Sequence, residues 1–169
     1  RIPVVFNGID LSRCIVKESY ARKDTFTVLH IGRFMDVKNH ELLLRSFARF
    51  KEHHSDARLQ LLGDGELKET MMQLADQLNI TDAVEFAGLQ SNVYPWLHNA
   101  DVFILPSKFE GMPMTLIEAM GTGLPIIASD VGGIPDMLTD QKDALLIAPK
   151  EENILVALEA IYSDEEKRK

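Results

Sequence analysis

Short runs of apolar residues alternate with longer amphipathic stretches along most of the chain. In the longer stretches apolar residues recur every three to four positions, as Leu43, Phe47 and Phe50 do, which predicts helices that bury one face. The short runs are nearly continuous in apolar residues, as is typical of strands covered on both faces of a parallel sheet. The expected strands are Thr27–Ile31, Arg58–Leu62, Val84–Ala87, Val102–Leu105, Pro125–Ser129 and Ala144–Ile147.

Strands joined by helices predict an α/β fold, namely a Rossmann-like parallel sheet of about six strands with helices on both faces. Asn39 is the expected N-cap of the helix that follows the first strand. We expect one domain over residues 1–169, with a polar loop in residues 12–24 and a tail in residues 163–169 that is frayed or a truncated helix. Ligands bind beyond the carboxyl ends of such strands, so functional residues are expected in the loops that follow them.

Composition narrows the possible partners. The 169 residues carry a net charge of −8, which argues against nucleic acid, because phosphate backbones bind clustered Lys and Arg. The single cysteine, Cys14, allows no internal disulfide, so a reducing cytoplasmic location is expected. No apolar run approaches the roughly 20 residues that span a bilayer, and peripheral membrane association of a longer protein stays open. His and Cys do not occur at metal-ligand spacing, so no metal or other cofactor is expected.

The most informative stretch runs from Phe109 to Gly121, between two expected strands. Pro113 suits the first position of a helix, because it lacks only an N–H group that would have no partner there. Three unpaired amides then face the loop, those of Met112, Met114 and Thr115. A helix N-terminus of this kind binds a phosphate well. Glu110 lies just before the helix and Glu118 within it, so carboxylates that could bind hydroxyl groups flank a site for an anion.

Glu110, seven intervening residues and Glu118 resemble the donor-site signature of the group 1 glycosyltransferases. Further motifs agree in order and spacing from residue 7 to about residue 148: Asn7-Gly8-Ile9-Asp10, Ile31-Gly32-Arg33-Phe34 with Lys38, Leu62-Gly63-Asp64-Gly65, Ala87-Gly88 to Val93, Ala100 to Ser107, and Ser129 to Pro135. The resemblance implies a retaining enzyme of the GT-B architecture, with two Rossmann-like domains around a cleft. The chain would then be the C-terminal, donor-binding domain without the N-terminal acceptor domain, and residues 1–24 would be the interdomain entry segment.

The resemblance also implies roles for single residues. Arg33 and Lys38 would bind the diphosphate of a nucleotide sugar, Glu118 the ribose hydroxyls, and Glu110 the donor sugar near its reacting carbon. Glu110, Arg33 and Lys38 are therefore the candidate catalytic residues. The complete donor-binding set is Gly32, Arg33, Lys38, Gly63, Gly65, Leu89, Glu110, Gly111, Met112, Pro113, Met114, Thr115 and Glu118. A UDP-sugar is the favoured donor, with GDP and ADP open, and the family's frequent glycine after the lysine is Asn39 here.

Other functions remain possible from the residues alone. The domain could bind a nucleotide sugar without turnover. It could be a dinucleotide-binding domain of an oxidoreductase, although Ile31-Gly32-Arg33-Phe34 lacks the three glycines that such a domain places over a pyrophosphate. Two carboxylates could also form a hydrolase pair, but glycoside hydrolysis has no diphosphate for the helix N-terminus to bind.

Overall fold

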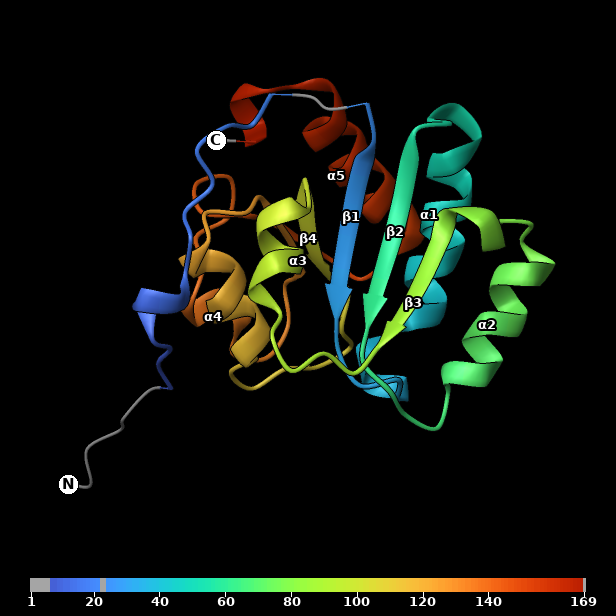
Figure 1. Cartoon of the computed structure of the whole chain (residues 1–169), viewed down its shortest axis with the longest axis horizontal. Coiled ribbons are helices and arrows are strands. Elements are labelled where there is room, and N and C mark those ends of the chain that lie inside the picture. The colour runs from blue at the N-terminus through green and yellow to red at the C-terminus, as the bar shows by residue number, and fades with distance from the viewer. Residues whose placement is uncertain (1–6, 22–23, 169) are drawn as a thin grey trace.

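The fold is a single parallel sheet of six strands in the order β3-β2-β1-β4-β5-β6 (Figure 1). The structure is a computed structural model that describes residues 7–21 and 24–168. Each strand begins and ends within one residue of its expected bounds, which confirms the predicted α/β fold. The strands are β1 (Phe26–Ile31), β2 (Ala57–Leu62), β3 (Val84–Gly88), β4 (Val102–Leu105), β5 (Ile126–Ser129) and β6 (Leu145–Ile147).

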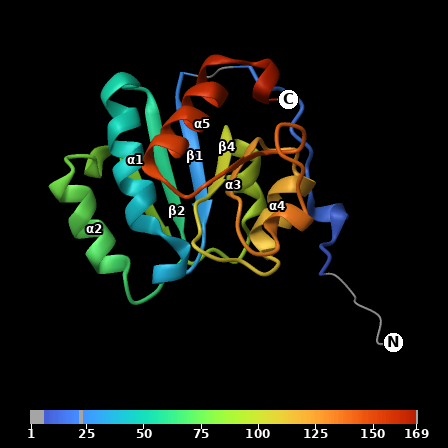
Figure 2. The same cartoon turned by 180° about the vertical axis from the view of Figure 1, so that it is seen from behind.

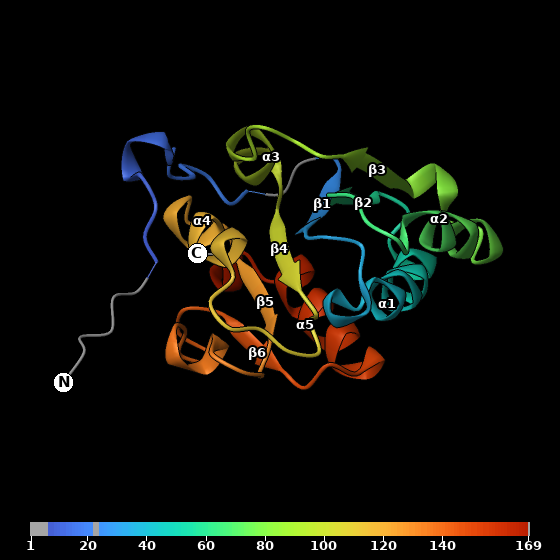
Figure 3. The same cartoon turned by 90° about the horizontal axis from the view of Figure 1, so that it is seen from below.

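Helices cover both faces of the sheet (Figures 2 and 3). On one face lie α1 (His40–His53), α2 (Lys68–Gln77) and α5 (Glu151–Ser163). On the other lie α3 (Tyr94–Asn99) and α4 (Met114–Gly121). The connecting helices change from one face of the sheet to the other after β3. From this edge strand the chain returns through α3 to β4, which lies beside β1. The order of strands therefore reverses between β1 and β4, and loops that leave the sheet in opposite directions open a crevice there.

Two apolar cores result, because successive strand residues point to opposite faces. Val28 is buried in the core under α1, α2 and α5, and Leu29 in the core under α3 and α4. β5 begins one residue later than expected because Pro125 has no N–H group to donate, although its carbonyl accepts the Phe103 N–H at 2.8 Å.

Both ends of the described chain are attached to the domain. Residues 14–21 form a loop as expected, and within it the buried Lys17 donates to carbonyls at the end of α3. Of the two alternatives for the tail, the frayed one does not hold for residues 166–168, which form a 3-10 helix. Arg168 is buried and its guanidinium donates to the carbonyls of Tyr20 and Ile161 at 2.9 and 2.8 Å. Residues 1–6, 22–23 and 169 of the expected entry segment and tail lie outside the described residues.

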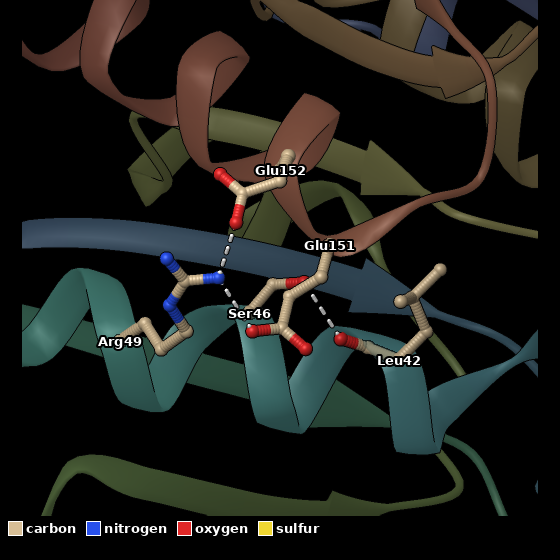
Figure 4. Close-up of polar contacts among 5 residues, drawn as sticks. All are labelled: Leu42, Ser46, Arg49, Glu151 and Glu152. Atoms are coloured by element: carbon tan, nitrogen blue, oxygen red, sulfur yellow. Dashed lines mark hydrogen bonds and ion pairs between the residues drawn. The ribbon is translucent and has the colours of Figure 1, made fainter.

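Charged residues bridge α1 and α5 at the surface (Figure 4). Arg49 of α1 donates to Glu151 and Glu152 in the first turn of α5, at 2.8 Å in both cases. These hydrogen bonds raise the pKa of the Arg49 guanidinium. Two carboxylates in the first turn also complement the dipole of α5. The contact therefore links α1 and α5 at their exposed edge, whereas the interior of the interface between the two helices is formed by buried apolar residues such as Leu43 and Leu158.

Replacing Arg49 with alanine is expected to lower the thermal midpoint by less than about 4 °C, because exposed ion pairs are screened by water and salt. A matched Leu43→Ala variant of the same helix is expected to lose several times more, since it leaves a cavity. Thermal unfolding followed by circular dichroism measures both. An equal loss in the two variants would contradict a surface role for Arg49.

Candidate functional site

The crevice lies between the loops that follow β1 and β4. Backbone pairing between these strands covers only Val28↔Val102 and Leu29↔Phe103, so the strands part before their carboxyl ends. The β1 loop then carries Gly32, Arg33 and the short 3-10 helix Asp36–Lys38, and the β4 loop carries Ser107 and Glu110. Candidate residues that are far apart in the sequence meet at this point.

Lys38 and Glu110 form the central contact. The Lys38 Nζ donates to Glu110 Oε1 at 2.6 Å, and the two side chains are only 18% and 10% exposed. The Ser107 hydroxyl, which is fully buried, donates to the same oxygen at 2.6 Å. Both loops are thus joined by a charge-assisted hydrogen bond, and the carboxylate is held by a donor from each loop.

Asn39 sets the direction of the chain between the 3-10 helix of the β1 loop and α1. It has φ 59° and ψ 40°, the left-handed conformation that glycine and asparagine adopt most readily. It is the N-cap of α1, as predicted, but its side chain makes no capping hydrogen bond. Instead its Nδ2 donates to the Pro106 carbonyl at the end of β4, at 3.1 Å. Asparagine therefore adopts here a conformation that is also open to glycine, and its side chain adds a hydrogen bond across the crevice.

The start of α4 carries the amides that the sequence predicts. Pro113 is the N-cap and not the first helical residue, because its ψ of 119° is extended and its carbonyl accepts from Leu116 and Ile117. The helix consequently begins at Met114, one residue later than expected. In the part of the chain that the structure describes, no acceptor contacts the N–H groups of Met112, Met114 and Thr115.

A pocket of about 500 Å³ opens beside these residues, at the carboxyl ends of β1, β2 and β3. Two of its glycines, Gly63 and Gly65, have φ of 136° and 156°. A side chain on either would collide with the β1 loop, since a Cβ would lie 2.0 Å from the Gly32 oxygen and 2.5 Å from the Phe34 oxygen. The lining residues are Ile31, Gly32, Arg33, Leu62, Gly63, Asp64, Gly65, Leu89, Gln90, Val93 and Thr115.

Two charged candidates point toward solvent or toward the entry segment. Arg33 is 68% exposed and lies 3.7 Å from the equally exposed Glu66, so its guanidinium is available at the pocket rim. Glu118 is half-buried in α4, and burial raises the pKa of its carboxyl while the charge of Arg13 opposes that shift. Arg13 itself stacks over the Tyr94 ring at 4.9 Å.

Glycines after β5 hold the Glu110 loop in place. The Gly133 N–H donates to the Glu110 carbonyl at 2.9 Å. A Cβ on Gly132, whose φ is 57°, would lie only 1.9 Å from that same carbonyl oxygen. This turn therefore packs against the backbone of Glu110 and does not itself line the 500 Å³ pocket described above.

A second, larger pocket of about 610 Å³ includes Tyr20, Pro125 and Arg168, at the amino ends of β5 and β6. Ligands of parallel sheets bind at the carboxyl ends, so we assign the site to the smaller pocket and the crevice beside it. Within residues 7–21 and 24–168, no three His, Cys, Asp or Glu side chains are grouped so that they could hold a metal ion. No helix of these residues is long and apolar enough to cross a membrane.

The chain belongs to the group 1 glycosyltransferases, because the model of that family, described as "Glycosyl transferases group 1", matches residues 14–169. Among curated proteins it is similar to the 4-alpha-N-acetylgalactosaminyltransferase of Campylobacter jejuni that acts on N-acetylgalactosamine-N,N'-diacetylbacillosaminyl-diphospho-undecaprenol. That relative is 32% identical, over 98% of this chain and 46% of its own length. EpsF of Bacillus subtilis, described as a putative glycosyltransferase, is 37% identical over 77% of this chain and 36% of its length.

Solved structures show the same fold. The lipopolysaccharide outer core galactosyltransferase WaaB, in its apo form, matches with a TM-score of 0.82 and 29% identity, over 99% of this chain and 47% of that chain. Anabaena HepE in complex with UDP and glucose matches with a TM-score of 0.85 and 20% identity, over 98% of this chain and 48% of that chain. The chain therefore spans less than half the length of these proteins.

The structure brings together most of the predicted residues. Six of them line one pocket: Gly32, Arg33, Gly63, Gly65, Leu89 and Thr115. Lys38 joins Glu110, and Gly111 to Met114 form the adjoining loop and helix start. Glu118 does not line the pocket. Sequence reasoning missed the role of Ser107, although it stands only three residues before Glu110, and it gave no role to the lining residue Val93.

Proposed function

We propose that this domain binds the nucleoside-diphosphate sugar from which a group 1 glycosyltransferase takes the transferred sugar. The observation that carries the proposal is the meeting of Lys38, Glu110 and the unpaired amides at the start of α4 in one crevice. Cations and helix amides stabilise the negative charge that a diphosphate leaving group gains, without a metal ion. The exposed guanidinium of Arg33 adds a planar donor at the rim.

The base and ribose would lie toward the 500 Å³ pocket. Its glycines let a planar base approach the backbone of the β2 loop, and Leu89 at the end of β3 is 78% exposed and free to cover it. Glu118 would accept the ribose hydroxyls and Glu110 those of the sugar, as the family resemblance implies. The Anabaena structure of the same fold contains UDP, so uridine nucleotides are the first to test.

The reaction itself belongs to a longer protein. We propose transfer with retention, in a cleft between this domain and an N-terminal acceptor domain, without a metal cofactor. The isolated chain should bind the donor and show essentially no transfer, because positioning both reactants accounts for about 7–11 kcal/mol of a barrier. A cytoplasmic location, with peripheral membrane association of the longer protein, is part of the same proposal.

Replacing Arg33 and Lys38 together with alanine is expected to weaken UDP binding at least about a hundredfold, since each charged hydrogen bond contributes about 1.5–3 kcal/mol. Calorimetric titration with UDP, GDP, ADP and NAD measures the affinities and ranks the bases. The matched control is Arg45→Ala with Arg49→Ala, which removes the same charge from the outer surface of α1. Unchanged UDP affinity in the first variant, or preference for NAD in the unaltered chain, would contradict the proposal.

A further inference from the structure

A buried imidazole lies beneath the crevice, between the separating ends of β1 and β4. His30 is fully buried, and its Nδ1 lies 2.8 Å from the Ile104 carbonyl oxygen. A carbonyl oxygen can only accept a hydrogen bond, so Nδ1 carries the proton and donates. The other ring nitrogen, Nε2, is therefore left with a lone pair that can accept.

His30 continues the contact between the strands after their backbone pairing has ended. Pairing stops at Leu29↔Phe103, and the imidazole of the next residue bonds the next carbonyl of β4 in place of a backbone N–H. This accounts for Nδ1 only. Nε2 is buried and has no hydrogen-bond partner among the described residues, although an orphaned buried acceptor is costly.

The unpartnered nitrogen lies beside Gly32, on the side of the β1 loop where the Lys38 side chain also passes. A Cβ built on Gly32 would lie 2.8 Å from His30 Nε2 and 3.4 Å from Lys38 Cδ, so the ring and the lysine stem border the same small space. Glycine at position 32 keeps that space open. Lys38 has two further atoms, Cε and Nζ, beyond this point, and rotation about its last bonds can bring the ammonium within reach of the ring while it still donates to Glu110.

The charges around the ring favour the accepting form. Burial lowers the pKa of His30 to about 4, and the nearby Lys38 charge adds to that shift while the Ile104 bond and Glu110 oppose it. His40 of α1 packs edge-on against His30 at 4.7 Å, and burial keeps it neutral as well. Among residues 7–21 and 24–168, the titratable groups that act on His30 are Lys38, Glu110 and His40, and of these Lys38 is the charged donor.

We propose that His30 is a positioning residue for Lys38 in the donor complex, with its Nε2 accepting a hydrogen bond from the lysine ammonium. The proposal rests on the proposed function. An ammonium has three N–H donors, and this arrangement gives one to Glu110, one to His30 and one to the diphosphate. Two fixed acceptors then direct the third donor into the crevice, and His30 needs no contact with the nucleotide.

Two substitutions separate the nitrogens of the ring. The amide nitrogen of asparagine can occupy the place of Nδ1, so His30→Asn keeps the donor to Ile104 and removes the acceptor. The longer glutamine can place its amide oxygen near Nε2, so His30→Gln keeps the acceptor and removes the strand bond. Calorimetric titration with UDP and with uridine is the test, because only UDP has the phosphates that Lys38 would bind.

We expect His30→Asn to bind UDP about 5- to 30-fold more weakly, the equivalent of losing one hydrogen bond, and to bind uridine as the unaltered chain does. His30→Gln should keep UDP affinity within about threefold while it unfolds at a lower temperature. In a Lys38→Ala background, His30→Asn should have no further effect on UDP affinity. Unchanged UDP affinity in His30→Asn, an equal loss for uridine, or a greater loss in His30→Gln would overturn the proposal.

A spectroscopic experiment on the unaltered chain tests the same proposal if a His30 variant fails to fold. In the unaltered chain, the ¹⁵N resonance of His30 Nε2 should move when UDP is added and stay in place when uridine is added. A resonance unmoved by saturating UDP would overturn the role of His30 and leave donor binding intact. Failure of the unaltered chain to bind UDP in the first titration would instead overturn the proposed function, and this inference with it.

Discussion

The Lys38→Met variant is expected to be less stable than the unaltered chain by about 3 kcal/mol, in addition to binding UDP more weakly. Methionine keeps the length of the stem but leaves the buried Glu110 carboxylate without its cation. Removing one partner of a buried ion pair costs about 3–5 kcal/mol, and the lower end applies because these side chains retain 18% and 10% exposure. Urea unfolding measures the loss as a change in the free energy of unfolding.

A second substitution separates the charge from the packing. In Lys38→Met with Glu110→Gln, the uncompensated carboxylate is gone, and the amide can still accept the Ser107 hydroxyl. The double variant should therefore recover more than half of the lost stability while its affinity for UDP stays lowered. A Lys38→Met variant as stable as the unaltered chain would contradict a structural role for the ion pair.

Stability should also fall steeply as the pH drops below about 6.5, because two buried histidines resist protonation. Burial lowers the pKa of His30 to about 4 and that of His40 to about 2, whereas both titrate near 6.5 in the unfolded chain. Between these values the unfolded state binds more protons than the folded state. The free energy of unfolding therefore falls with decreasing pH, by about 1 kcal/mol per pH unit for each histidine.

Urea unfolding at pH 7.5, 6.5, 5.5 and 4.5 tests this dependence. His40→Gln should reduce the slope between pH 6.5 and 4.5 by about half, because one of the two depressed groups is removed. His53→Gln is the matched control, since it removes an exposed histidine from the end of the same helix. A slope that His40→Gln does not alter would show that the folded state does not keep His40 neutral over this pH range.

The parts of the structure that depend on apolar patterning follow closely from the sequence. All six strands and the helices with apolar stripes could be predicted, because burial on two faces leaves a nearly continuous apolar run. The positions of Arg33, Lys38 and Glu110 could be predicted too, since they follow strands whose carboxyl ends meet at one edge. Their roles rest on the family resemblance and stay predictions.

Other features depend on backbone conformation and long-range contacts. Asparagine is a common N-cap, and the sequence alone does not show that Asn39 adopts a left-handed conformation and bonds β4. Pro113 suits both the N-cap and the first helical position, because a φ of −71° fits either one. The structure of the tail could not be predicted, because it depends on hydrogen bonds from the buried Arg168 to the carbonyls of Tyr20 and of α5. The local sequence around Arg168 gives no sign of these contacts.

His30 illustrates the same limit within the site. A histidine in an apolar run is most simply explained as a core residue with satisfied nitrogens, and one nitrogen is indeed bonded. The unpartnered second nitrogen becomes visible only when β1 and β4 are placed side by side and Gly32 is seen above the ring. A role that depends on one unpartnered nitrogen can be inferred only from the three-dimensional structure.

A crystal structure of the chain with UDP is the most direct test of donor binding in the crevice. We predict that the diphosphate contacts the Lys38 ammonium, the Arg33 guanidinium and the amides at the start of α4, with uracil in the pocket beside Leu89 and Gly63. Nucleotide bound at the amino ends of β5 and β6, in the pocket beside Arg168, would contradict the assignment of the site. So would a diphosphate that contacts neither the Lys38 ammonium nor any of the amides at the start of α4.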